Sequence, residues 1–122
     1  MTITWNDKLP IYLQLKERVL GMMLDGVIKP GEPLPSVRQI AAEYSLNPIT
    51  VSRAYQELVD EELVEKRRGM GMYVIDGARD KLLASERERF IVTEWPAFLE
   101  RIKRLGINLD DLLNATKMGG AA

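Results

Sequence analysis

The side chains best suited to chemistry in this sequence are arginines and lysines that lie beside turn signals. Lys66, Arg67 and Arg68 follow one another directly before a glycine, and Arg38 and Arg53 lie within two helical patterns upstream. Charged groups of this kind bind phosphate, and a guanidinium can also pair with the edge of guanine in the DNA major groove. The pattern therefore indicates a surface for nucleic acid rather than a reaction centre.

The net charge of −1 gives no global signal for nucleic-acid binding. Residues 1–76 hold 9 basic and 11 acidic side chains, so the region that contains the basic run is slightly acidic as a whole. Salt limits repulsion from distant charges to about one Debye length, ~8–10 Å, and a local basic edge can still attract DNA. The position of the basic side chains therefore matters more than their number.

Residue types for catalysis and for metal binding are scarce. The chain has no cysteine and no histidine, which removes thiolate nucleophiles, the commonest general base and the commonest transition-metal ligand. Asp110 and Asp111 are paired carboxylates, but their place at a predicted helix start fits complementation of the helix dipole. We expect no enzyme, no cofactor and no metal site.

Length and composition predict one small domain with a short appendage. The chain has 122 residues, of which 46% are hydrophobic and 29% charged, an ordinary globular balance. No apolar run reaches the ~18 residues that a membrane span needs, and no basic-then-apolar leader precedes the predicted fold. We expect a cytoplasmic protein that does not associate with membranes.

Three helices are predicted upstream of the basic run. Pro10 opens the first, Ser36 caps the second with Gln39 in the capping-box position, and Asn47 caps the third with Pro48 at its first position. One face of the third helix is expected to be buried, and the opposite face to be free for a partner. The predicted buried face consists of Val51, Ala54, Tyr55 and Leu58, and the opposite face of Ile49, Ser52, Arg53 and Gln56.

Two short strands are predicted around the basic run, at 63–67 and 71–75. They flank the tip Arg68-Gly69-Met70, where glycine permits the positive φ of a tight hairpin. Helix, helix, tight turn, helix and hairpin is the order of a winged helix-turn-helix, whose third helix enters the major groove. The predicted fold is α+β, mostly α, with the winged helix-turn-helix in residues 1–76 and a short helical dimerisation segment in 77–122.

Residues 78–105 are predicted to form a helix that Pro96 kinks or breaks, because proline lacks the amide that would bond to the Val92 carbonyl. Apolar residues on this segment recur at heptad-like spacing. One monomer cannot easily bury them, so we expect two copies to pack across a twofold axis. The expected dimer interface consists of Ile91, Trp95, Phe98, Leu99, Ile102 and Leu105.

Three stretches of the sequence resemble the GntR family of bacterial transcription regulators. They read LPSVRQIAAE at 34–43, NPITVSRAYQEL at 47–58 and LVEKRRGMGMYV at 63–74, and the match covers roughly residues 10–75. The Asn-Pro start of the third helix and the short C-terminal segment resemble the YtrA subfamily in particular. The resemblance implies a homodimer that binds a double-stranded DNA operator with dyad symmetry and represses its own operon, often one with transporter genes.

The resemblance also implies which residues meet DNA. By position it places against DNA the residues Arg38, Pro48, Thr50, Ser52, Arg53, Arg68 and Gly69, and the basic run adds Arg67. Many relatives have arginine at the positions of Pro48 and Ser52, so specificity is expected to rest more on Arg38, Arg53 and DNA shape. Ser45 stands where the family usually has glycine, and we expect slight strain in that turn.

Other interpretations stay open at this point. Arg38 could pair with Glu43 and Arg53 with Glu57, and the basic run could protect an edge strand against aggregation. Winged helices also bind proteins, so the alternative function is a protein-interaction module without sequence-specific DNA binding. The operator sequence, the regulated genes and the existence of a small-molecule effector are not predicted; an effector site would be expected at the dimer interface.

Overall fold

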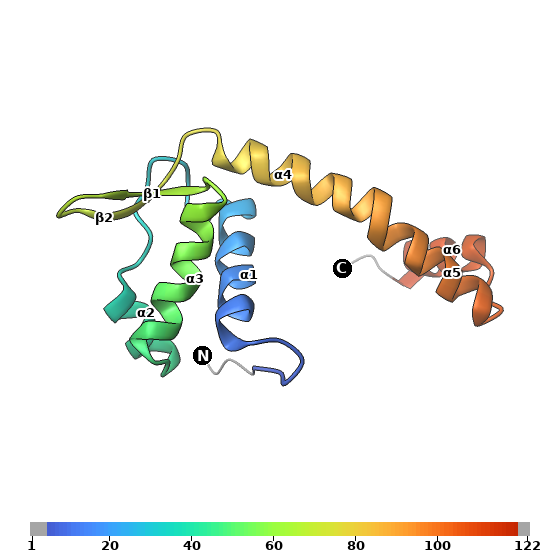
Figure 1. The fold of residues 1–122 in the computed structure, drawn as a ribbon. Coiled ribbons are helices and arrows are strands. Elements are labelled where there is room, and N and C mark those ends of the chain that lie inside the picture. The colour runs from blue at the N-terminus through green and yellow to red at the C-terminus, as the bar shows by residue number, and fades with distance from the viewer. Residues whose placement is uncertain (1–4, 120–122) are drawn as a thin grey trace. The chain divides into compact units, whose positions relative to one another are not determined.

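The computed structural model describes residues 5–119, with side chains for residues 5–117. The chain divides into two compact units between Leu83 and Ala84. The first unit holds helices α1 (Ile11–Leu24), α2 (Val37–Tyr44) and α3 (Pro48–Asp60), strands β1 (Val64–Arg67) and β2 (Gly71–Val74), and the start of α4 (Ala78–Arg89) (Figure 1). The second unit holds the rest of α4, the π-helical turn η1 (Phe90–Glu94), α5 (Trp95–Arg104) and α6 (Leu109–Gly119). This order of elements confirms the predicted fold class.

The predicted caps of α2 and α3 are confirmed. The Ser36 hydroxyl accepts a hydrogen bond from the Gln39 amide at 3.0 Å, and Gln39 Oε1 accepts one from the Ser36 amide at 2.8 Å. At α3, Asn47 Oδ1 accepts from the amide of Ile49 at 2.9 Å, and Pro48 is the first helical residue. These contacts satisfy amides that a helix leaves unpaired at its start. Both helices therefore begin at well-defined residues.

The turn between α2 and α3 passes through a left-handed residue. Ser45 has φ 54° and ψ 47°, and the next amide, that of Leu46, donates to the Ala41 carbonyl at 2.9 Å. A residue with a Cβ is strained in this region, and glycine is not. Ser45 therefore has the left-handed backbone in which the expected strain would arise, and the strain itself stays a prediction.

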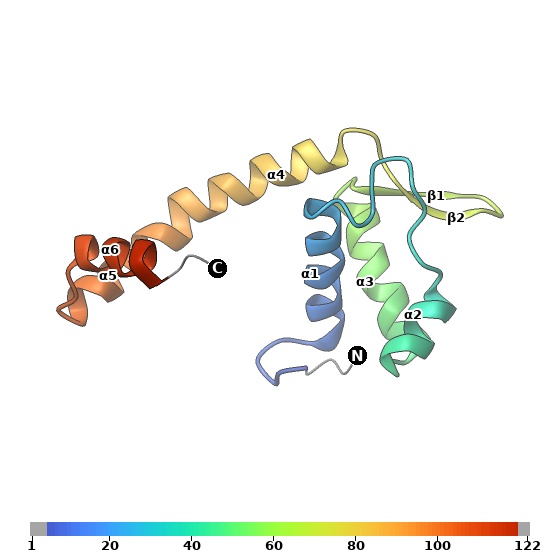
Figure 2. The same ribbon diagram turned by 180° about the vertical axis from the view of Figure 1, so that it is seen from behind.

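The core of the first unit surrounds α3. The four side chains of its predicted buried face are at most 1% exposed, and α1 lies alongside α3 in the same direction (Figures 1 and 2). The rest of the core consists of Leu15, Val19, Leu20, Met23, Ile28, Leu34, Ile40, Ala41, Leu63, Val64, Val74, Ala78 and Leu82. Because Ala78 and Leu82 belong to this core, the first unit extends beyond residue 76, where the sequence placed the domain boundary.

The hairpin is antiparallel and is anchored on the segment that connects α1 to α2. Val64 pairs with Val74 and Arg67 with Gly71, as the predicted strands require. On its other side β2 contacts residues 31–34: the Leu34 amide donates to the Met72 carbonyl at 2.8 Å, and Pro33 and Tyr73 form an isolated β-bridge. The hairpin is therefore bonded to the segment that leads directly into α2.

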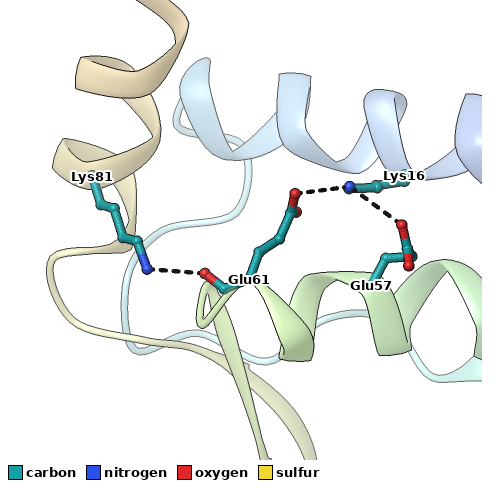
Figure 3. A network of polar contacts seen from close by, with 4 residues as sticks. All are labelled: Lys16, Glu57, Glu61 and Lys81. Atoms are coloured by element: carbon teal, nitrogen blue, oxygen red, sulfur yellow. Dashed lines mark hydrogen bonds and ion pairs between the residues drawn. The ribbon is translucent and has the colours of Figure 1, made fainter.

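A lysine joins α1 to α3 (Figure 3). Lys16 Nζ lies 3.0 Å from Glu61 Oε1 and 3.6 Å from Glu57 Oε1. Burial by itself would lower the pKa of Lys16, but the hydrogen bond to Glu61 and the charges of both glutamates raise it above its ordinary value of 10.5. Lys81 Nζ of α4 donates to the Glu61 carbonyl at 3.0 Å. Polar contacts from α1 and α4 thus converge on the end of α3.

The helix predicted over 78–105 does not break at Pro96. α4 continues into the π-helical turn and then into α5, and the Trp95 amide donates to the Phe90 carbonyl, five residues back. In a regular α-helix the proline ring would clash with the Val92 carbonyl, and the wider turn just before Pro96 changes that register. The sequence left a kink and a break as the two outcomes; the structure excludes the break and shows a π-helical turn directly before Pro96.

The backbone at Ser45 leads to a prediction about stability. Substitution Ser45→Gly is expected to stabilise the full chain by about 0.5–1 kcal/mol, because glycine adopts the left-handed conformation without a Cβ clash. The measurement is urea unfolding followed by circular dichroism.

Ala42→Gly in α2 is the matched control, since it adds a glycine where no positive φ is needed. It should lose about 1 kcal/mol. If Ser45→Gly is no more stable than the parent protein, the turn holds no strain that glycine can relieve.

Candidate nucleic-acid interface

The exposed face of α3 is the centre of the candidate interface. Ile49, Ser52, Arg53 and Gln56 are all exposed, as predicted, and Thr50 is half-buried. The Asn47 cap fixes the first turn of the helix, and the core fixes its opposite face. These side chains therefore project from a rigid backbone, and a single α-helix fits the DNA major groove.

A buried tyrosine ties α3 to the start of α2. The Tyr55 hydroxyl donates to the Pro35 carbonyl at 2.7 Å, directly before the Ser36 cap. Burial raises the pKa of Tyr55 well above its ordinary value of 10.0, and Tyr44 adds to this effect. The phenol therefore keeps its proton at neutral pH and remains a donor. This hydrogen bond sets the position of the α2 N-terminus relative to α3.

Arg38 lies on α2, beside the start of α3. Its side chain is exposed and lines a hollow together with Leu46 and Pro48. Within residues 5–117, Arg38 forms no ion pair, and the pairing with Glu43 that the sequence left open is not present. Its guanidinium is therefore available to a phosphate or a base edge.

Arg53 has a different partner from the one that helical spacing suggests. Its guanidinium carbon lies 4.0 Å from the ring centroid of Tyr12 on α1, a cation–π contact. Glu57, the expected i+4 partner, is instead 3.6 Å from Lys16. The Tyr12 ring therefore restricts the Arg53 side chain at the edge of the exposed face without neutralising its charge.

The basic side chains of the hairpin differ in whether they already contact another side chain. Arg67 is engaged, because its Nε lies 3.1 Å from Glu65 Oε1 and its guanidinium carbon lies 4.0 Å from the ring centroid of Tyr73. Lys66 and Arg68 form no ion pair with any side chain that the structure describes. Of the hairpin arginines, Arg68 is thus the one whose charge is not already paired with a described side chain.

A cleft separates the hairpin from the helices. Its volume is about 550 Å³, and its lining includes Ser52 of α3, Lys66 of β1 and Met70 of the hairpin tip. Gly69 has φ 74°, and the Met70 amide donates to the Arg67 carbonyl at 2.9 Å, which closes the tip. The exposed face of α3 and the basic hairpin therefore border the same cleft.

The residues predicted for dimerisation lie on η1 and α5 or just after them. Their side chains are largely accessible within the described chain, and Phe98, for example, is 56% exposed. The exposed ones are Ile91, Trp95, Phe98 and Leu105, and the half-buried ones are Leu99 and Ile102. The structure thus leaves this apolar face open, and the dimer interface itself stays a prediction.

The described residues show no feature of a metalloprotein or of a protein with a membrane-spanning helix. Those residues contain no group of three or more acidic side chains arranged to hold a metal ion. None of the helices within residues 5–119 is both long and apolar enough to span a membrane.

Sequence reasoning missed the contacts of Arg53 with Tyr12 and of Arg67 with Tyr73. Tyr12 is half-buried, and the Arg53 guanidinium lies over its ring. Tyr73 is the cross-strand partner of Glu65 and lies diagonally across the hairpin from Arg67. In the hairpin, the predicted strand register could have shown the second contact. No spacing rule links α1 to α3, so the first contact had no local signal.

Comparison with known proteins gives a consistent family. The model of the family described as "Bacterial regulatory proteins, gntR family" matches residues 11–74. The chain is 43% identical over 74 residues to the HTH-type transcriptional repressor YtrA of Bacillus subtilis, an alignment that covers 61% of this chain and 57% of that protein. It is also 32% identical to the uncharacterized HTH-type transcriptional regulator YhcF of the same species, with 88% of each chain covered. These relatives are named as transcription regulators, not as enzymes.

Solved structures agree with the sequence matches. A GntR family transcriptional regulator from Listeria monocytogenes superimposes with a TM-score of 0.76 at 28% identity, covering 93% of this chain and 98% of that one. The AraR DNA-binding domain, solved in complex with operator ORX1, has a TM-score of 0.56 at 23% identity and covers 61% of this chain and 94% of its own. The likeness to AraR is one of fold alone.

The Tyr55–Pro35 hydrogen bond leads to a prediction about pH. Because folding raises the pKa of Tyr55, its protonated form contributes stability that is complete below pH 10.0 and is lost as the pH rises above that value. Tyr55→Phe should cost about 1 kcal/mol at pH 7 and should reduce the alkaline loss of stability. Urea unfolding at pH 7 and at several pH values above 10.0 measures both effects.

Tyr73→Phe is the control, because no described hydrogen bond involves the Tyr73 hydroxyl. At pH 7 it should keep the stability of the parent protein, because it loses no described hydrogen bond. An alkaline dependence in Tyr55→Phe equal to that of the parent protein would contradict the role given to burial of this phenol.

Proposed function

Because this chain belongs to the GntR family of bacterial regulatory proteins, we propose that it is a sequence-specific DNA-binding repressor that acts as a homodimer on a dyad-symmetric operator. Its relative YtrA is named as a transcriptional repressor, and the alignment with this chain covers 57% of YtrA. The genes that it controls include its own operon and are of the transporter class. It works in the cytoplasm, where that operon is transcribed.

One observation carries the proposal: a capped, rigid helix presents its open face beside a basic hairpin. The face of α3 begins at the Asn47 cap and includes Arg53. Arg38 of α2 lines a hollow with Pro48 at the start of α3, and Arg68 belongs to the hairpin that borders the same cleft as Ser52. Neither guanidinium forms an ion pair within residues 5–117. A helix in the major groove, flanked by arginines for the phosphates, is the arrangement by which a winged helix-turn-helix binds DNA.

The proposed contacts follow from this arrangement. Arg38 and Arg53 are the candidates for base edges or nearby phosphates, because each can make two parallel hydrogen bonds. Arg68 contributes more to phosphate binding than Arg67, whose guanidinium already contacts Glu65 and Tyr73. The proposed DNA-binding residues are Arg38, Pro48, Thr50, Ser52, Arg53, Arg67, Arg68 and Gly69.

The second unit supplies the dimer in this proposal. Ile91, Phe98 and Leu105 are each more than half exposed, and a twofold axis would cover this apolar face with a second copy. The proposed interface consists of Ile91, Trp95, Phe98, Leu99, Ile102 and Leu105. If the protein has a small-molecule effector, this interface is where we place its site.

The alternative function is a protein-interaction module that does not bind DNA. The comparisons with known proteins give no support to it.

A gel-shift titration tests DNA binding. The probe is the DNA upstream of the protein's own gene, and the variants are Arg38→Ala and Arg53→Ala. Each variant should weaken operator binding about tenfold or more in Kd, because each loses a contact to a base or phosphate. Binding by the parent protein should also weaken steeply with salt.

Arg87→Ala on α4 is the matched control, because it removes the same charge from an exposed site outside the candidate interface. It should bind like the parent protein. If the parent protein binds the upstream fragment no more tightly than a non-specific duplex, with no salt-sensitive shift, the repressor proposal fails. The next experiment is then to identify a protein partner.

A second test addresses the dimer. Phe98→Ala should raise the dimer dissociation constant about tenfold or more, because two copies of an exposed phenyl ring lose their apolar contact. Operator binding should weaken with it, since each protomer supplies one recognition helix. Sedimentation velocity measures the dimer, and the gel shift measures operator binding. A Phe98→Ala protein that stays dimeric and binds the operator normally contradicts this interface.

A further inference from the structure

Helix α3, the recognition helix of the proposed function, has an unusually exposed apolar side chain in its first turn. Ile49 is 75% exposed, the highest value among the large hydrophobic side chains that the structure describes. It belongs to the exposed face of α3, one turn before Ser52 and Arg53. The arginine contacts proposed above do not involve Ile49.

A single exposed hydrophobic residue is common on protein surfaces and by itself means little. Ile49, however, lies in the first turn of α3, and its own amide is held by Asn47 Oδ1 at 2.9 Å. A β-branched side chain in a helix keeps essentially one χ1 rotamer. The backbone and the χ1 torsion of Ile49 are therefore restricted before any partner arrives, which lowers the conformational entropy that it loses on binding.

The major groove offers one apolar group to such a side chain. Thymine alone among the four bases projects a methyl group, at C5, into that groove. Ser52 and Arg53 lie on the same helix face at i+3 and i+4, so polar and apolar contacts would reach neighbouring bases. Resting on the proposed function, we infer that Ile49 is a specificity-determining residue that recognises the C5-methyl group of a thymine in each half-site.

The test removes the methyl group without changing the Watson–Crick pairing. The fragment upstream of the gene is amplified once with dTTP and once with dUTP, and both products are titrated with the full-length parent protein and with Ile49→Ala. The parent protein should bind the uracil fragment about fourfold more weakly per half-site, as burial of one methyl group implies. Ile49→Ala should bind the thymine fragment correspondingly more weakly and should hardly distinguish the two fragments.

Two controls separate this contact from general effects. Val27→Ala truncates another exposed aliphatic side chain, 69% exposed in the segment after α1, and should keep the parent ratio between the two fragments. Ile49→Ala should also keep the parent salt dependence, because it removes no phosphate contact.

The outcomes are distinct. Equal binding of both fragments by the parent protein overturns the inference and leaves the repressor proposal intact. Retention of the full thymine preference by Ile49→Ala also overturns it, because the methyl group would then be recognised by another residue. Absence of salt-sensitive binding by the parent protein to either fragment would overturn both the inference and the proposed function.

Discussion

Burial of one face of α3 fixes the rest of the first unit. Val51, Ala54, Tyr55 and Leu58 are enclosed by α1, α2 and the strands, so the helix cannot rotate about its axis without breaking the core. The orientation of the opposite face is therefore a consequence of packing rather than of any contact on that face. The hydrogen bond of Tyr55 extends this control to the start of α2. Specificity for DNA thus depends on side chains that never touch it.

Charge is distributed in the first unit in a way that suits an anionic partner despite the acidic total. Glu57 and Glu61 lie on the side of α3 that faces α1, where Lys16 partly neutralises both. Exposed ion pairs contribute little to stability, but they do reduce the repulsion that unpaired carboxylates would exert on DNA. Arg38 and Arg68 form no ion pair with any carboxylate among the described side chains. The slightly acidic composition is therefore compatible with a locally basic interface.

Sequence reasoning succeeded where the determinants were local. The Ser36 and Asn47 caps, the buried face of α3 and the glycine-tipped hairpin each follow from residues within one or two turns of one another. It failed where distant segments decide the outcome. The contact of Arg53 with Tyr12 depends on how α1 packs against α3. The π-helical turn before Pro96 was missed for another reason: several backbone responses relieve the same proline clash, and the sequence does not rank them.

The pairing of β2 with residues 31–34 has a consequence for how the protein is made. Nearly all of α2, α3 and β1 lies between the paired segments, so this contact closes a long loop of chain. Contacts of this kind form after local ones, because closing a long loop costs entropy before any gain. On the ribosome, helices can form as they emerge, but the cleft between hairpin and helices can form only after β2 has been synthesised. A chain that ends before β2 therefore lacks one wall of the candidate interface.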